Sequence, residues 1–179
     1  MKLFILSILG ALFVSGPIAA VPASLSEVQI NRLDGTPLAL SELNGKAILF
    51  VNVASRCGFT KQYEGLQALH RTYADKGLVV IGVPSNDFNQ ETGNAEEIQA
   101  FCERNYGVDF VMTEKIQVRK QPLHPLYAYL TGSNPKVKAK VSWNFNKILV
   151  DRSGQVAGHY GSWVKPQSKK LVRAIEAAL

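Results

Sequence analysis

The residue of this sequence best placed to do chemistry is a cysteine that follows a strongly apolar run. Cys57 comes shortly after Ala47–Val53, and small and polar residues surround it. A continuous run of Val, Ile, Leu and Phe is typical of a strand buried on both faces. Open α/β sheets bind their ligands at the carboxyl ends of such strands. The sequence therefore predicts a thiol held at the ligand-binding edge of a sheet.

The neighbours of Cys57 favour a negatively charged sulfur. Arg56 precedes it and Lys61 follows it. Residues 63–74 predict a helix, because their apolar side chains recur at helical spacing at Leu66, Leu69 and Tyr73. This helix would place Cys57 at its amino terminus, where the helix dipole stabilises a thiolate. We therefore expect Cys57 to react as a nucleophile.

The second cysteine leaves three alternatives open. Thr60 stands where a Cys-x-x-Cys dithiol exchanger carries its second sulfur, which excludes a local dithiol. The distant Cys102 could resolve an oxidised Cys57, behave as a small hydrophobe in the core, or form a purely structural disulfide with Cys57. On cysteine count alone, the structural disulfide is favoured.

Two predicted strands bring a second loop to the edge that holds Cys57. Residues 78–83 are a second apolar run, and the helix at 63–74 lies between it and the first. Strand, helix and strand in this order predict a right-handed parallel crossover. The polar loop 84–93 therefore leaves the same edge of the sheet as Cys57.

The remaining segments complete a single α/β domain with a central mixed sheet flanked by helices. Cys102 falls on or beside the apolar face of one of these helices, with Ile98 and Phe101. The segments are an N-terminal β-hairpin over 28–38, a helix with a capping box at Asn94 and Glu97 that ends near Gly107, a short helix over 122–130, a surface loop over 131–142, an antiparallel hairpin over 143–160 and an amphipathic helix over 168–179.

Composition is that of one globular domain. The chain has 179 residues, of which 46% are hydrophobic and 19% charged. Its 20 Lys and Arg against 14 Asp and Glu are spread along the sequence. No dense basic stripe interleaved with aromatic residues is present, so we expect no nucleic-acid partner.

The first residues have the pattern of a secretory signal peptide. Met1-Lys2 is followed by an apolar run over 3–14, a Gly-Pro break and small residues. The run is shorter than the roughly 20 residues of a membrane-spanning helix. We expect residues 1–23 to be removed by cleavage after Ala20 or Ala23, leaving a single domain over 24–179 that is periplasmic or secreted and not inserted in a membrane.

Several motifs resemble the glutathione peroxidase family in its cysteine form. Residues 52–60 resemble its peroxidatic motif, and Trp143-Asn144-Phe145 resembles its second signature. Further likenesses at 76–78, 84–88 and 124–127 extend the resemblance over nearly all of the mature chain. The resemblance implies a thioredoxin-like fold and reduction of hydrogen peroxide and organic or lipid hydroperoxides.

By the same resemblance, Cys57 is the peroxidatic sulfur and Gln90, Trp143 and Asn144 complete the site. The amides and the indole N–H are donors that orient the sulfur and stabilise the departing oxyanion. The family usually has two residues between the loop phenylalanine and this glutamine, whereas here there is one, so Asn89 is the alternative to Gln90. Outside the motif, Trp143 would be interpreted as a core aromatic and Asn144 as a turn residue at a strand edge.

Cys102 resembles the resolving cysteine of the family members that use thioredoxin. The resemblance implies a thioredoxin-like protein or glutathione as reductant. If Cys102 resolves an oxidised Cys57, the helix that carries it must locally unwind, because cysteines whose Cα atoms are more than ~7 Å apart cannot be bridged without backbone movement. It also implies a monomer, because the loop over 131–142 is shorter than in tetrameric members. No metal or cofactor is expected, and His70, His124 and His159 lack metal-ligand spacing.

The competing functions are a thiol-based sensor or oxidant of a client protein and a non-enzymatic domain with a structural disulfide.

Overall fold

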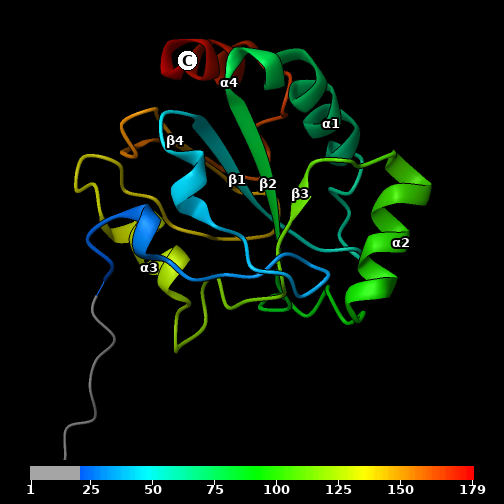
Figure 1. Ribbon diagram of the computed structural model, residues 1–179. Coiled ribbons are helices and arrows are strands. Elements are labelled where there is room, and N and C mark those ends of the chain that lie inside the picture. The colour runs from blue at the N-terminus through cyan, green and yellow to red at the C-terminus, as the bar shows by residue number, and fades with distance from the viewer. Residues whose placement is uncertain (1–20) are drawn as a thin grey trace, which may run out of the picture.

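The computed structural model describes residues 21–179, and the predicted signal segment over 1–20 lies outside them. Five strands form one sheet in the order β3-β2-β1-β4-β5 (Figure 1). Their bounds are β1 (Ala47–Val53), β2 (Leu78–Pro84), β3 (Val111–Met112), β4 (Lys147–Val150) and β5 (Val156–Tyr160). The sheet is mixed as predicted, because β1, β2 and β3 run parallel while β4 and β5 pair antiparallel.

The central strand β1 is buried, as its apolar composition predicts, and Cys57 follows its carboxyl end. All seven of its residues are buried. Helix α1 (Gln62–Tyr73) connects it to the parallel strand β2. Ala47 pairs with Leu78 and Val53 with Pro84, so the two strands end level with each other. The segments that follow them therefore leave from one edge of the sheet.

Helices cover both faces of the sheet (Figure 1). Alternate residues of β1 such as Leu49 and Val51 join the core shared with α1, α2 (Ala95–Tyr106) and α4 (Lys169–Ala178). Ile48 and Phe50 point to the other core, which is closed by α3 (Pro125–Gly132) and the N-terminal segment. Three short 3-10 turns add to these elements: η1 (Leu25–Glu27), η2 (Leu40–Leu43) and η3 (Ala74–Lys76).

Helix ends follow the signals in the sequence. Asn94 and Glu97 form the predicted capping box at the start of α2, each side chain accepting the other residue's backbone N–H at 2.9 Å. Gly107 ends α2 with a φ of 59°, a left-handed conformation that glycine adopts readily. Ser168 caps α4 by accepting the N–H of Leu171. The predicted helices over these segments are thus confirmed.

Three local expectations need correction. Helix α1 begins at Gln62, so Cys57 lies in the turns before the helix and not at its amino terminus. Residues 143–146 form a turn, and the strand predicted to start at Trp143 starts at Lys147. The hairpin over 28–38 is reduced to one bridge between Asn31 and Pro37, because this segment also turns to meet the end of β3 at Thr113.

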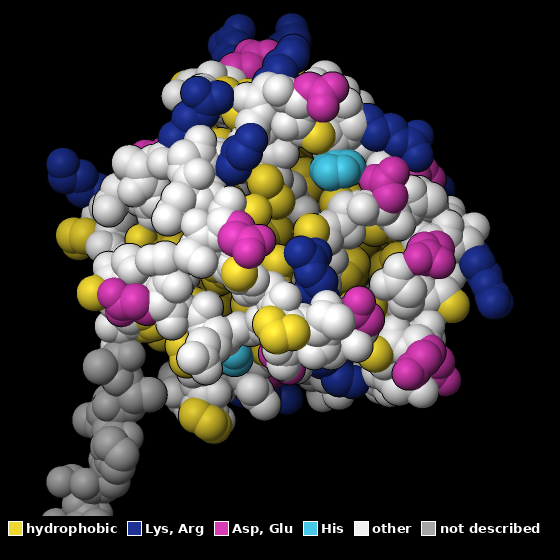
Figure 2. Space-filling model, viewed as in Figure 1, with side chains coloured by type: hydrophobic (Ala, Val, Ile, Leu, Met, Phe, Trp, Pro, Cys, Tyr) yellow, Lys and Arg dark blue, Asp and Glu magenta, His cyan; other side chains and the backbone are white. Residues whose placement is uncertain are grey.

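The surface of the described residues carries charges of both signs. Figure 2 shows basic and acidic side chains interspersed, with apolar side chains visible in the hollows between them. Within residues 21–179, no helix is long and apolar enough to cross a membrane.

Candidate active site

Cys57 lies in the turn region between β1 and α1 with little contact with solvent. The residue is only 4% exposed, and its thiol is free. The N–H of Thr60 donates to the Cys57 carbonyl at 3.2 Å, which closes a tight turn after the cysteine. The sulfur is therefore held on a structured turn at the edge of the core.

Asn52 fixes the end of β1 to the turn that carries Trp143. Its Nδ2 donates to the Trp143 carbonyl at 2.9 Å, and its Oδ1 accepts the N–H of Asn146 at 3.0 Å. The N–H of Phe145 donates to the Asn52 carbonyl at 2.6 Å. Asn52 was not predicted from the sequence, although a buried polar residue inside an apolar strand is a usable signal, because such a group needs partners.

Gln90 and Asn144 meet next to the segment that carries Cys57. Asn144 Nδ2 donates to Gln90 Oε1 at 2.8 Å, and the N–H of Arg56 donates to the Gln90 carbonyl at 3.0 Å. Asn144 is a turn residue, as its ordinary interpretation expected, but its buried side chain also reaches Gln90. Asn89 is exposed in a left-handed turn with a φ of 57°. The contact with Asn144 is thus made by Gln90 and not by Asn89.

Trp143 lies at the surface of the same edge. Its ring packs on Phe88 with centroids 5.1 Å apart, and the residue is 40% exposed. Such exposure does not fit the interpretation of Trp143 as a core aromatic. The indole is accessible beside the turn, where a bound molecule could reach it.

A layer of polar side chains supports the turn over 143–146. Asn146 Nδ2 donates to the Trp143 carbonyl at 2.7 Å, and Asn146 Oδ1 contacts His159 Nε2 at 2.9 Å. Ser162 Oγ donates to the Asn144 carbonyl at 2.6 Å. Burial lowers the pKa of His159, which favours the neutral ring. His159 is therefore a structural residue, as its sequence context indicated.

A buried carboxylate holds the other side of the Cys57 turn. Glu91 Oε2 accepts the Ser55 N–H at 2.8 Å and the Ser55 hydroxyl at 3.0 Å. Burial raises the pKa of Glu91, although both bonds from Ser55 favour the ionised form. Glu91 was not predicted from the sequence, since nothing in a polar loop marks which acid turns inward.

A buried lysine ties the start of α1 to the segment after β5. Lys147 is fully buried, and its Nζ donates to Gln62 Oε1 and, at 2.7 Å, to the Val164 carbonyl. Gln62 Nε2 in turn donates to the Ser162 carbonyl at 2.7 Å. Burial lowers the pKa of Lys147 to about 7. This group positions the first turn of α1, which follows shortly after Cys57.

Cys102 is buried in α2 and shares a core with Cys57. It is 1% exposed and its thiol is free, so this structure contains no structural disulfide between the two cysteines. Burial raises the pKa of Cys102 to about 11, and the nearby Tyr63 hydroxyl offsets part of this rise. Its place on the apolar side of α2 is as predicted.

The described part of the chain offers no evident metal centre. Within residues 21–179, no three His, Cys, Asp or Glu side chains gather in a way that could hold a metal ion. At this edge of the sheet, the Asn144 side chain bonds to Gln90, and the Gln90 carbonyl bonds to Arg56, the residue before Cys57.

Solved structures place this fold among the thioredoxin-like proteins. A thiol:disulfide interchange protein of the thioredoxin family from Chlorobium tepidum has a TM-score of 0.63 over 89% of this chain and 97% of its own, at 19% sequence identity. A likeness at this identity defines the fold alone. Together with the free thiol of Cys57 after β1, it defines a thioredoxin-fold protein that has Thr60 where a Cys-x-x-Cys dithiol would have its second cysteine.

Closer comparisons define the family. The glutathione peroxidase family model matches residues 25–131. The hydroperoxy fatty acid reductase gpx1 of Synechocystis is 47% identical over 144 residues, covering 76% of this chain and 85% of that protein. The glutathione peroxidase-like peroxiredoxin HYR1 of Saccharomyces cerevisiae is 44% identical over 148 residues, covering 81% and 90%. The crystal structure of T. cruzi GPX1 has a TM-score of 0.66 and 30% identity, covering 87% and 95%. The chain belongs to the glutathione peroxidase family, and its class of activity is thiol-dependent peroxide reduction.

Proposed function

We propose that Cys57 is the peroxidatic residue and that it reduces hydrogen peroxide and organic hydroperoxides. The thiolate attacks one oxygen of the peroxide, the O–O bond breaks, and the other oxygen leaves as water or an alcohol after taking a proton. The sulfur is oxidised to sulfenic acid. The observation that supports this assignment best is the Asn144–Gln90 hydrogen bond of 2.8 Å next to Arg56.

The polar side chains at this edge supply hydrogen bonds to the reacting atoms. Gln90, Trp143 and Asn144 each carry an N–H group able to stabilise a developing oxyanion. The side chains of Asn52 and Ser162 donate to the Trp143 and Asn144 carbonyls and hold these two residues in place before peroxide arrives. Such preorganisation is what an oxyanion site requires.

We further propose a two-cysteine cycle in an exported protein. Cys102 condenses with the sulfenic acid on Cys57, which forms a disulfide and releases water. A thioredoxin-like dithiol, which is itself oxidised to a disulfide, or two molecules of glutathione, which end as glutathione disulfide, then reduce the Cys57–Cys102 bond to two thiols. The signal pattern in residues 1–23 supports a periplasmic or secreted protein, for which an exported thioredoxin-like protein is a suitable donor, and the short loop over 131–142 supports a monomer.

Peroxide consumption by the purified protein tests this function. Wild type should reduce hydrogen peroxide with a thioredoxin system or with glutathione, and Cys57→Ser should lose this activity. Mass spectrometry after one equivalent of peroxide should show a Cys57–Cys102 bond. No turnover with either donor would reject the peroxidase, and transfer of oxidation to a client protein would then favour the sensor. A stable sulfenic or glutathionylated Cys57 would reject only the two-cysteine cycle.

A further inference from the structure

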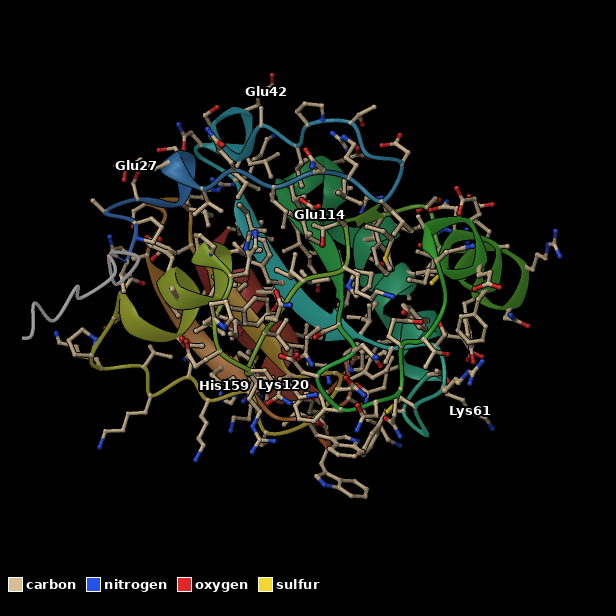
Figure 3. All side chains as sticks on the ribbon, turned by 90° about the horizontal axis from the view of Figure 1, so that it is seen from below. Glu27, Glu42, Lys61, Glu114, Lys120 and His159 are labelled. Carbon is tan, nitrogen blue, oxygen red and sulfur yellow. The ribbon has the colours of Figure 1, made fainter. Side chains whose placement is uncertain are left out.

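A small hollow lies between helix α2 and the turn that follows β1. Its volume is about 300 Å³. The residues that line it include Ser55 and Arg56 from the turn, Glu91 from the loop after β2, and Ile98 and Phe101 from α2. Figure 3 shows Lys61, which ends the turn, on the side of the molecule that carries α2 and opposite Glu27. We call this feature the Glu91 hollow, and it separates the segments that carry the two cysteines.

Glu91 has an unused acceptor at this hollow. The residue is 1% exposed, and its Oε2 accepts the N–H and the hydroxyl of Ser55 at 2.8 and 3.0 Å. Its Oε1 is also buried but has no hydrogen-bond partner among the residues that the structure describes. A buried acceptor without a partner destabilises a protein, so it calls for a functional explanation.

Hydrogen bonds hold Glu91 to the edge of the sheet and not to α2. Its N–H donates to Asn86 Oδ1 at 3.0 Å within the loop after β2. Its carboxylate is bound to Ser55, which lies in the turn after β1. If α2 opens, Glu91 therefore stays beside the turn that carries Cys57.

Cys102 lies on the side of α2 that faces the Glu91 hollow. It follows Ile98 by four residues, so the two side chains share one face of the helix. Both residues are 1% exposed, and Ile98 lines the hollow. A Cys102 that moves toward Cys57 therefore approaches the carboxylate of Glu91.

The resolving step needs a proton acceptor. Burial raises the pKa of Cys102 to about 11, so near neutral pH this residue is a thiol and not the reactive thiolate. Burial also raises the pKa of Glu91, which makes it a stronger base than an exposed carboxylate, while Arg56 and Lys115 favour its charged form. The ionisable groups around the two residues are Arg56, Tyr63, Glu97, Glu103 and Lys115.

We propose that Glu91 is the general base of the resolving step and takes the proton from the Cys102 thiol as its sulfur attacks the sulfenic acid on Cys57. The S–H bond of Cys102 breaks and an S–S bond forms, while the S–O bond on Cys57 breaks. The leaving hydroxide takes the proton from Glu91 and departs as water, which regenerates the carboxylate. The Cys102 sulfur is oxidised and the Cys57 sulfur is reduced. This inference rests on the proposed two-cysteine cycle and assigns a base to it.

Glutamine in place of Glu91 tests this role, because its amide oxygen still accepts both bonds from Ser55 but takes no proton. After one equivalent of peroxide, rapid quench and mass spectrometry follow the sulfenic acid on Cys57 and the disulfide separately. Glu91→Gln should form the sulfenic acid within about twofold of the wild-type rate and the disulfide about 100-fold more slowly at pH 7. Glu97→Gln changes the other acid of the hollow and keeps the capping box of α2, so this matched control should behave as wild type in both steps.

The dependence on pH separates a base from a structural support. The deficit of Glu91→Gln should shrink as the pH rises from 7 to 10, because more of the Cys102 thiol then ionises without help. Glu91→Asp keeps a carboxylate and should form the disulfide at least about tenfold faster than Glu91→Gln at pH 7. Equal disulfide rates in wild type and Glu91→Gln, or a deficit that is the same at every pH, would overturn the proposal. A sulfenic acid that never reacts with Cys102 would overturn it as well.

Diamide distinguishes this role from the proposed function. It oxidises Cys57 without peroxide, and attack by the Cys102 sulfur on the adduct then forms the same disulfide and releases the hydrazine. A wild type that reacts with diamide but not with peroxide would refute the proposed function. A slower diamide-driven disulfide in Glu91→Gln than in Glu97→Gln would then still support Glu91 as the base, and equal rates would reject it.

Discussion

Lys147 is a cation buried in the fold, and its only hydrogen-bond acceptors in the described chain are neutral oxygens of Gln62 and Val164. Burial lowers its pKa from 10.5 to about 7, because the charged form loses its hydration. An unfolded chain keeps the ordinary pKa. Between these two values the unfolded chain binds one more proton than the folded chain, so the free energy of unfolding rises with pH in this window.

This linkage predicts how Lys147→Met behaves. The stability of wild type relative to the variant should increase by about 2 kcal/mol between pH 7 and pH 9, since one proton is worth about 1.4 kcal/mol per pH unit. Urea unfolding of both proteins at pH 6, 7, 8 and 9 measures the difference. The exposed Lys169→Met controls for the loss of a lysine charge. Parallel curves for wild type and Lys147→Met would contradict the prediction.

Asn144 is a residue whose loss should affect chemistry far more than folding. Asn144→Ala removes a donor and leaves Gln90 Oε1 without this partner. Loss of one oxyanion donor typically lowers the rate about 100-fold or more. Stopped-flow measurement of the first equivalent of peroxide should show a loss of this order, while urea unfolding shows a destabilisation of about 1–3 kcal/mol, which leaves the variant folded. The exposed Asn44→Ala is the control, and similar rates for both variants would remove Asn144 from the proposed mechanism.

Single residues also mark where prediction from the sequence ended. Motif and residue type identified Cys57, Trp143 and Asn144 as candidate site residues, because the chemistry of a thiol, an indole or an amide follows from the residue type. Asn52 and Glu91 organise the same site through buried hydrogen bonds that depend on where distant segments meet. No local sequence pattern predicts which distant segments pack together, so Asn52 and Glu91 were identified only from the folded structure.

At the scale of elements, α2 is the helix that must move if Cys102 resolves Cys57. The Cys102 thiol is buried in the core, and burial raises its pKa to about 11. The thiol therefore reacts more readily once the helix opens and exposes it. The rate of disulfide formation should then follow the population of the opened helix.

Removal of the α2 cap tests whether opening of this helix limits disulfide formation. Asn94→Ala removes the side chain that accepts the Glu97 N–H, at a cost of about 1 kcal/mol. We expect disulfide formation after one equivalent of peroxide to accelerate about fivefold, measured by rapid quench and mass spectrometry. Ser168→Ala removes the equivalent cap of α4, which carries no cysteine, and should leave the rate unchanged. An unchanged rate in Asn94→Ala would show that opening of α2 does not limit this step.

Elements differ in how far local sequence determined them. The apolar runs of β1 and β2 and the periodicity of α1 were sufficient to predict the parallel crossover, because burial on both faces leaves a strong pattern. Strand β3 has only two residues, Val111–Met112, and it exists through pairing with β2. So short a run carries no periodicity of its own, and it was not predicted.

At the scale of the whole molecule, the site is a junction of segments far apart in the chain. The turn after β1, the loop after β2, the turn before β4 and the segment after β5 meet at one edge of the sheet. Parallel strands that end level explain the first two, and these were predictable. The other two come from antiparallel pairing on the opposite side of β1, whose register the sequence pattern did not define.

The proposed export of the whole chain leads to the last prediction. Expression of residues 1–179 in a Gram-negative host should yield a periplasmic protein whose amino-terminal residue is Val21 or Ser24, because signal peptidase requires a small residue before the cut. Intact mass and amino-terminal sequencing identify which of these two residues begins the mature protein.

Two substitutions separate the cleavage sites. Ala20→Phe should block processing only if the cut follows Ala20, and Ala23→Phe only if it follows Ala23. A cut after Ala20 would retain the bond from the Ala23 N–H to Glu27 Oε2, of 3.1 Å, whereas a cut after Ala23 would remove this amide from the mature chain. Recovery of the protein with Met1 in the cytoplasm would contradict export. The reductant would then have to be sought among cytoplasmic dithiols, since thiol donors differ between these compartments.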